Sequence, residues 1–388
     1  MKISKLEPAV VKDKVVVIRV DFNVPLDNGK ITETTRIESS IPTLKFLIDN
    51  GAKSIHILTH VGRPKGKIVP ELSTKVLVST IEKFLGEKVE YREDFTKGDS
   101  LIQLHENVRY WPGETKNDPE FTQLILDGIK PDIFVNDGFA VSHRPHSSVV
   151  GVASFVPAYP GVVVESEIKN LSPFLSNEKI PGLTIVVAGA KMETKVGVLR
   201  HFAKTAENVL VGGALANTFL AAEGFDVGAS LYEESELDNA RDVLGLMEQH
   251  NTGFHLPIDV ICADDINSSE TLDMPVEDVT GDAKIFDIGA HSIKSYCEIL
   301  QHSKVIMWNG PVGCFEKKPF ENGTREILKI VSAQKSAKTI LGGGDTLDAL
   351  KKFGVSRDAF SHVSTGGGAM LEFLEGKLLP GIEVLLEN

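Results

Sequence analysis

Glycine-rich loops follow apolar, strand-like runs at five places in the second half of the sequence. The loops lie at 189–191, 212–213, 308–311, 342–346 and 366–368. Glycine lets backbone N–H groups approach an anion closely, and a helix that follows directs its positive end toward the same anion. One such loop is often only a turn. Five in a parallel-sheet pattern predict a nucleotide cradle at the carboxyl edge of the sheet.

Basic and polar side chains follow the expected strands of the first half. They lie at 19–25, 60–64, 106–109, 136–139 and 143–146, and Arg36 stands at the start of the first expected helix. Arginine binds carboxylate or phosphate with a planar fork of donors. Arginines that converge from separate loops would repel one another without an anion between them. Each residue alone could be a solvated charge or a turn cap, but their joint placement predicts a site for a small anion.

Composition and charge exclude several classes of protein. The chain has 388 residues, a net charge of −13 and 42% hydrophobic residues, as expected for two or three globular domains. The net charge is −1 over residues 1–170 and −12 over 171–388, which argues against nucleic acid as a main partner. We expect no membrane span, because no apolar run approaches the required 18–20 or so residues. The three cysteines, Cys262, Cys297 and Cys314, are widely spaced, which indicates a reducing cytoplasm and no metal motif.

Strands and helices are expected to alternate along the chain. In the first half the patterns predict strands at 15–20, 54–59, 101–108 and 132–136 and helices at 37–50 and 73–85. The same rhythm is expected to repeat from Thr184 onward. Alternation of this kind indicates βαβ units and a mainly parallel sheet.

A domain boundary is expected between Val162 and Gly182, where prolines and glycines flank a helical stretch at 164–171. We predict an N-terminal domain over 1–165, a hinge helix and linker over 166–181, a C-terminal domain over 182–374 and a tail over 375–388. The alternative is that the helix lies inside one large domain.

Together these motifs closely resemble those of phosphoglycerate kinases, over essentially the whole chain. The resemblance rests on 19–25, 60–64, 106–109, 308–313, 342–346 and 364–369. It implies an α/β fold of two doubly wound parallel-sheet, Rossmann-like domains joined by a hinge helix, with a tail that returns to the N-terminal domain. It also implies a monomeric cytoplasmic transferase of glycolysis and gluconeogenesis. That enzyme transfers a phosphoryl group reversibly, with Mg²⁺, between ATP and the carboxylate of 3-phosphoglycerate, giving ADP and 1,3-bisphosphoglycerate.

The resemblance also implies roles for individual residues. The triose domain would bind 3-phosphoglycerate through residues of several loops: Asp21, Phe22, Asn23, Arg36, His60, Val61, Gly62, Arg63, Arg109 and Arg144. The nucleotide would be bound by residues of the second domain: Gly189, Lys191, Lys195, Gly213, Asn309, Pro311, Glu316, Gly343, Gly344, Asp345 and Thr346. Arg36, Lys195, Gly366 and Gly367 would be catalytic, and Asp345 would hold Mg²⁺ directly or through water.

Two loops depart from the usual family pattern. Thr194 stands where the family usually has an acid, two residues after Met192, and Ala188 replaces a glycine. The stretch 137–143 also differs, with Gly138 and Val141 among its unusual residues. These departures concern loop geometry and nucleotide affinity rather than the reaction class.

The expected acceptor is a carboxylate with a reference pKa near 4, so it is ionised at neutral pH and no general base is required. Catalysis would then depend on alignment, charge neutralisation and domain closure. An oxidoreductase would need Gly-x-Gly-x-x-Gly after the first strand, and a P-loop enzyme would need Gly-x4-Gly-Lys-Ser/Thr; neither motif is present. A non-catalytic anion- or nucleotide-binding protein would be expected to lack Arg36, Lys195 or Asp345, which this sequence retains.

Overall fold

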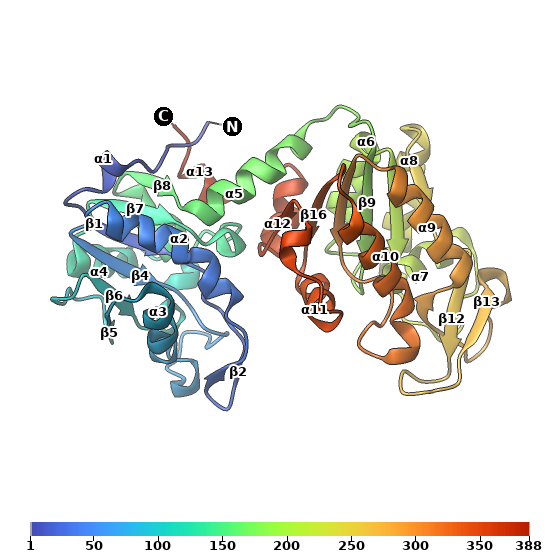
Figure 1. The fold of residues 1–388 in the computed structure, drawn as a ribbon, viewed down its shortest axis with the longest axis horizontal. Helices are drawn as coiled ribbons and strands as arrows, with labels where there is room; N and C mark the ends of the chain where they lie inside the picture. Colours follow the sequence, from blue (N-terminus) through green and yellow to red (C-terminus); the bar gives the residue numbers. More distant parts are fainter. Residues whose placement is uncertain (1, 388) are drawn as a thin grey trace. The chain divides into compact units, whose positions relative to one another are not determined.

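The structure is a computed structural model that describes residues 2–387. These residues form two compact units. Unit 1 extends to Ser172 and resumes at Lys377, and unit 2 is Pro173–Gly376. Each unit is built around its own sheet (Figure 1).

Unit 1 contains a six-stranded parallel sheet with the order β5-β6-β4-β1-β7-β8. Its strands are β1 (Val15–Arg19), β4 (Ser54–Leu58), β5 (Val89–Arg92), β6 (Ile102–His105), β7 (Ile133–Asn136) and β8 (Ala158–Pro160). Its helices are α1 (Pro8–Val11), α2 (Thr35–Asp49), α3 (Val78–Leu85), α4 (Pro119–Ile129), α5 (Val162–Leu171) and α13 (Pro380–Glu383), and β2 (Leu26–Asp27) pairs with β3 (Lys30–Ile31). Every residue of β1 and β4 is buried, because a parallel sheet covered on both faces favours continuous apolar runs.

Two predicted elements of unit 1 are shorter than expected. The helix predicted from Ser73 begins as a 3-10 turn, where the Ser73 side chain accepts from Lys75 N, and α3 starts only at Val78. The strand predicted to reach Val108 ends at His105, because the Glu106 carboxylate accepts hydrogen bonds from Asn107 N (2.6 Å) and Thr74 N (2.8 Å). These local side-chain bonds compete with the regular backbone ladder.

The tail returns to unit 1, as predicted. Ile3 and Leu386 form an antiparallel bridge, so the two ends of the chain run side by side (Figure 1). Within α13, Gly381 N donates to Ser142 O (2.8 Å), and Gly381 O accepts from Asn136 Nδ2 (2.7 Å) at the end of β7. The tail therefore supports the loop that follows β7.

Unit 2 contains a second six-stranded parallel sheet, with the order β11-β10-β9-β15-β16-β17. Its strands are β9 (Leu183–Ala188), β10 (Asn208–Gly212), β11 (Gly253–His255), β15 (Val305–Asn309), β16 (Lys338–Gly342) and β17 (His362–Val363). Its helices are α6 (Val196–Thr205), α7 (Gly213–Glu223), α8 (Leu237–Gln249), α9 (Ala290–His302), α10 (Asn322–Ala333), α11 (Gly344–Lys352) and α12 (Gly368–Leu374).

A small antiparallel sheet interrupts the predicted rhythm of unit 2. It has the order β13-β12-β14, from β12 (Asp259–Ala263), β13 (Leu272–Pro275) and β14 (Lys284–Ile288). The prediction of uniform strand–helix alternation from Thr184 onward was wrong here. No α-helix separates these strands, and β12 pairs antiparallel with both β13 and β14, so no crossover helix is required.

The two parallel sheets confirm the predicted α/β fold class. Among residues 2–387, no helix combines the length and apolar character needed to cross a bilayer. The predicted hinge region, 166–181, overlaps the second part of α5, and this helix lies within unit 1 and contacts α2. Its role as a hinge stays a prediction.

Candidate active site

The predicted triose residues gather at the carboxyl edge of the unit 1 sheet. Asp21 and Asn23 follow β1, His60 follows β4, Arg109 follows β6 and Arg144 follows β7. These four strands are neighbours in one parallel sheet, so their carboxyl ends meet at one edge. We call this cluster, with Arg36, Gly62 and Arg63, the basic half-site.

Hydrogen bonds join the loops of the basic half-site to one another. Arg36 Nη1 donates to Asp21 Oδ2, which ties the start of α2 to the end of β1. Gly62 N donates to Asn23 Oδ1 (2.8 Å), and Gly62 O accepts from Arg109 Nη1 (3.0 Å). Gly62 has a φ of +62°, which glycine adopts without strain. The three loops are thus held in one arrangement before any ligand binds.

A buried arginine fixes the proton on His60. Arg19 at the end of β1 is fully buried, and its Nη2 lies 3.2 Å from His60 Nδ1. A guanidinium can only donate, so His60 Nδ1 accepts and the neutral ring carries its proton on Nε2. Burial, together with the charges of Arg19, Arg109 and Arg36, holds the pKa of His60 well below its ordinary value. His60 is therefore a neutral donor to any ligand at Nε2.

A second buried group balances the charge of Arg19. Arg19 Nε donates to Ser148 Oγ (2.8 Å), and Ser148 Oγ donates to Glu114 Oε1 (2.6 Å). Burial alone would raise the pKa of Glu114, but His146, Arg19 and Ser148 hold it below its ordinary value. The buried carboxylate lets a charged arginine lie beneath the half-site without an exposed counter-ion.

Arg109 has a donor that a ligand could satisfy. Its side chain is largely buried, and Nε has no hydrogen-bond partner among the described residues. Burial, followed by repulsion from Arg19 and Arg144, lowers the pKa of Arg109 to about 10. An unpaired buried N–H and repulsion between cations both favour an anion at this position.

The remaining predicted triose residues differ in exposure. Arg63 is exposed and makes no hydrogen bond or ion pair within residues 2–387, and Arg144 Nε donates to His143 Nε2 (3.0 Å). Phe22 and Val61 are 0% and 1% exposed and pack in the core. Only the backbone of these two residues is available to a ligand.

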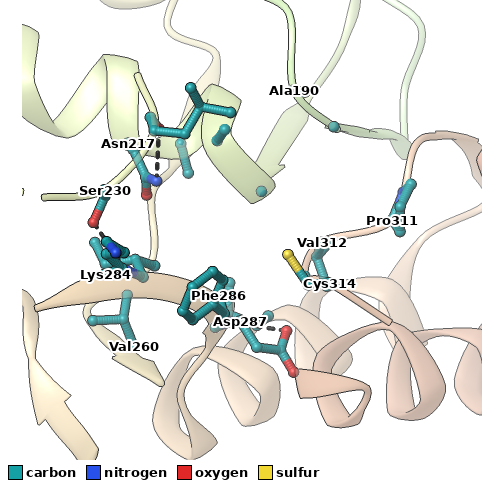
Figure 2. Close-up of a pocket in the computed structure, with 18 of the residues that line it drawn as sticks. Ala190, Asn217, Ser230, Val260, Lys284, Phe286, Asp287, Pro311, Val312 and Cys314 are labelled. Atoms are coloured by element: carbon teal, nitrogen blue, oxygen red, sulfur yellow. Dashed lines mark hydrogen bonds between the residues drawn. The ribbon is translucent and has the colours of Figure 1, made fainter. Parts of the chain in front are cut away.

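Unit 2 contains a cavity of about 650 Å³ near the ends of β9, β10 and β15. Five of the residues predicted to bind nucleotide line it: Gly189, Gly213, Pro311, Glu316 and Asp345. Its other walls come from α7 and β14, and apolar side chains such as Phe286, Val260 and Val312 supply much of the surface (Figure 2). A cavity with a largely apolar wall and a few polar groups is typical of a small-molecule site.

Three other predicted nucleotide residues, Lys195, Asn309 and Thr346, form polar contacts beside this cavity rather than in its wall. Lys195 Nζ donates to Asn309 Oδ1, and Asn309 Nδ2 donates to Gly342 O (3.0 Å). Gly310 N donates to Thr346 Oγ1 (2.8 Å), which joins the loop after β15 to α11. Burial lowers the pKa of Lys195 to about 8, while the charge of nearby Asp345 acts in the opposite direction.

Close backbone packing explains one of the glycines. A Cβ atom at Gly310 would lie 2.1 Å from Ala188 O, and its φ is +97°. Gly343 and Gly344 lead into α11, with Gly343 at φ +99°. Lys191 is exposed on the loop after β9. Gly366 N donates to Ser364 Oγ (3.0 Å), so of the two predicted catalytic glycines this one already has a partner for its N–H.

Comparison with known proteins identifies the family. The family described as Phosphoglycerate kinase matches residues 6–377. The structure of phosphoglycerate kinase from Coxiella burnetii is 38% identical, covers 99% of this chain and 98% of its own, and superposes with a TM-score of 0.88. The crystal structure of the enzyme from Pyrococcus horikoshii OT3 is 30% identical, with 98% of each chain covered and a TM-score of 0.83.

The chain belongs to the phosphoglycerate kinase family. It is therefore a phosphotransferase, and the family predicted from its sequence motifs is confirmed. Membership implies 3-phosphoglycerate and ATP as substrates, with ATP or ADP as the nucleotide.

The two departures from the family pattern lie in different settings. Thr194 is exposed, and its hydroxyl donates to Lys191 O (3.1 Å), so it holds the loop after β9 without adding charge. In the other loop, Asp137 is buried and its Oδ1 accepts from Thr43 Oγ1 and Val163 N, both at 2.9 Å. That aspartate joins β7 to α2 and α5.

Sequence reasoning missed much of the kinase's cavity wall. Asn217, Ser230, Lys284 and Phe286 line it, although none belongs to a glycine-rich loop. Two of them lie on β14, in the antiparallel sheet that was not predicted. The only available signal was the β-branched run of β12 and the alternating pattern of β14, which indicate strands but not their role.

Proposed function

We propose that the chain catalyses reversible, Mg²⁺-dependent, in-line phosphoryl transfer between ATP and the carboxylate of 3-phosphoglycerate. The observation that carries this proposal is the basic half-site, where a neutral histidine donor and an unpaired buried guanidinium N–H face an edge rich in arginine. Family membership supports the assignment of the anion as 3-phosphoglycerate.

The proposed roles within the basic half-site follow from charge and donor geometry. Arg63, Arg109 and Arg144 would hold the phosphate of the triose. Asp21, Asn23, His60 and Arg36 would hold its hydroxyl and carboxyl end, with His60 donating from Nε2. The carboxylate acceptor is already ionised, so these residues need only orient it and reduce its repulsion from the incoming phosphoryl group.

In unit 2 the nucleotide would lie in the cavity. Its phosphates would lie toward Lys195, Gly343 and the start of α11, where a helix of nine residues presents free N–H groups. Glu316, exposed at the rim, would meet the ribose. Lys195 would neutralise charge on the transferred group. A cation at such a position is worth about 10³–10⁵ in rate by analogy with arginine fingers.

Asp345 would hold Mg²⁺, which supplies charge neutralisation for the phosphates. No cluster of three or more His, Cys, Asp or Glu side chains suited to a metal occurs in residues 2–387. One exposed carboxylate beside a phosphate site fits Mg²⁺, because this ion is usually bound by one or two carboxylates together with phosphates and water. Calorimetry should therefore show that Asp345→Asn weakens ADP binding in the presence of Mg²⁺ and changes it little in EDTA. Equal weakening in both conditions would contradict the metal role.

The proposed half-sites lie in different units, so transfer requires the units to close on each other, with the segment around α5 as the hinge. Closure would also exclude water and limit ATP hydrolysis. We further propose a monomer in the cytoplasm with no nucleic-acid or membrane partner. The net charge of −13 and three cysteines without disulfides support that setting.

A coupled assay with ATP, Mg²⁺ and 3-phosphoglycerate tests the function directly. We expect ATP-dependent formation of 1,3-bisphosphoglycerate and negligible ATP hydrolysis without the triose. Binding of both ligands by calorimetry without turnover would instead indicate a non-catalytic binding protein.

A further inference from the structure

The cavity of unit 2 contains a buried polar atom with no partner. Asn217 lies in α7, is 2% exposed and lines the cavity. Its Nδ2 donates to Leu231 O (3.0 Å), but its Oδ1 makes no hydrogen bond within the described chain. A buried carbonyl oxygen without a donor is unfavourable, because it has lost its hydrogen bonds to water and gained none in exchange. This deficit is expected at a position where a ligand supplies the missing donor.

The orientation of the Asn217 amide is fixed. Leu231 O is a backbone carbonyl and can only accept, so the amide nitrogen must face it and the oxygen must face away. Figure 2 shows the amide of Asn217 among the cavity residues, with this hydrogen bond dashed. The free acceptor is therefore a constant feature of the wall.

Neighbouring polar groups of the wall are already engaged elsewhere. Ser230 Oγ accepts from Ile285 N (2.9 Å), and Lys284 Nζ donates to Asp264 O (2.9 Å). Neither side chain donates to Asn217 Oδ1 in the structure. A molecule in the cavity is thus a natural source of the missing donor.

Only one part of a nucleotide suits this position. This inference rests on the proposed nucleotide site, in which phosphates lie near Lys195 and α11 and ribose near Glu316. Phosphate oxygens are acceptors and would be repelled by Asn217 Oδ1. The remaining part is the base, which matches the apolar wall formed in part by Leu231, Val260 and Phe286.

We propose that Asn217 Oδ1 selects a purine with an amino group at position 6 over one with a 6-oxo group. The amino group of adenine donates to the unpaired oxygen, whereas the 6-oxo group of hypoxanthine would place a second acceptor against it. A site with a buried polar group rejects a ligand that leaves this group unpaired.

The test compares ADP with inosine diphosphate by calorimetry, so it does not depend on turnover. Wild-type protein should bind ADP at least about tenfold more tightly than inosine diphosphate, as expected for one buried hydrogen bond. Asn217→Leu, which has a similar shape but no acceptor, should bring this ratio close to one, mainly by weakening ADP.

A matched control is Asn208→Leu in the same unit. Asn208 Oδ1 is paired with His255 Nε2 (3.0 Å), and Asn208 does not line the cavity. This variant should keep the wild-type ratio, and circular dichroism with thermal melting should report that unit 2 of each variant is folded.

Three results would overturn the inference. Equal affinity of the wild type for ADP and inosine diphosphate would overturn it even if the enzyme turns over ATP and 3-phosphoglycerate. An unchanged ratio in folded Asn217→Leu would assign selectivity to another residue. No ADP binding at all, together with no turnover, would overturn the proposed function as well.

Discussion

Arg36 combines two features, since it pairs with Asp21 and is the predicted catalytic residue that would hold the carboxyl end of the triose. Because it is held by a carboxylate and remains partly exposed, its fork is oriented before ligands bind. Such preorganisation is what electrostatic catalysis requires.

Replacing Arg36 by Ala should lower turnover by several orders of magnitude and leave ATP binding nearly intact. Arg36→Lys should recover little, because one ammonium cannot reproduce the planar fork. Steady-state kinetics and calorimetry with ATP measure the two effects. If Arg36→Ala kept more than about a tenth of wild-type turnover, a loss below about 1.4 kcal/mol, the proposed role would be wrong.

His60 provides a second test, of the tautomer set by Arg19. His60→Gln places an amide N–H near the position of Nε2 and should keep part of the triose affinity, whereas His60→Ala should lose more, by about tenfold or greater. The pKa of His60 is held well below its ordinary value, so kcat/KM for the triose should show no His60 titration near pH 6.5. A pH step there that disappears in His60→Gln would contradict the neutral donor.

At the scale of elements, Asp137 connects three of them. Its Oδ1 accepts from Thr43 in α2 and from Val163 in α5, while Oδ2 is buried and makes no close hydrogen bond among the described residues. The Ser40 hydroxyl is near enough to the carboxyl group to oppose part of the effect of burial on its pKa. Burial raises the pKa of Asp137 to about 7, compared with about 3.9 in an unfolded chain. The folded state thus favours the protonated carboxyl group.

Between about pH 4 and pH 7 the folded state binds the extra proton, so the contribution of Asp137 to stability falls as pH rises through this window. Asp137→Asn removes the titration and should make unit 1 more stable than wild type at pH 8, by up to a few kcal/mol. Thermal melts from pH 5 to pH 8 should show a flatter dependence for the variant.

Asp287 in unit 2 is a useful contrast. Burial also raises its pKa to about 7, but its two oxygens accept from Ile288 N and Gly323 N. Asparagine there loses an acceptor, so Asp287→Asn should give no gain at pH 8. A gain in Asp287→Asn without one in Asp137→Asn would show that the unpaired oxygen is not what matters.

At the scale of the whole molecule, the proposal requires closure. Either ligand alone contacts mainly one unit and favours the closed state weakly, whereas both together supply contacts found only in that state. A shift from 1:99 to 99:1 requires about 5.5 kcal/mol, which a few charge-assisted contacts could supply.

Solution scattering should therefore give a smaller radius of gyration in the ternary complex than in either binary complex. Lys195→Ala should weaken that compaction, because Lys195 is assigned to the phosphate that crosses between the substrates. Asn208→Leu, a substitution outside both proposed half-sites, serves as the control. Its radius of gyration should decrease in the ternary complex as much as that of the wild type. A radius of gyration that is the same in apo, binary and ternary samples would contradict the proposed role of the segment around α5 as a hinge.

The fold class, the family, the strand ends that precede His60 and Arg109 and the helix starts that carry Arg36 and Asp345 could all be predicted from the sequence. These follow from local patterns, since a buried parallel strand is a continuous apolar run and functional loops follow its carboxyl end. The spacing of glycine and arginine is visible without coordinates.

Which side chains come into contact could be learned only from the folded structure. The antiparallel sheet that brings Phe286 into the cavity wall, the proton position on His60 and the unpaired oxygen of Asn217 all depend on partners distant in sequence. Leu231, for example, is 14 residues from Asn217. Hydrogen-bond satisfaction and burial depend on how the whole chain packs, and no local pattern of residues reports them.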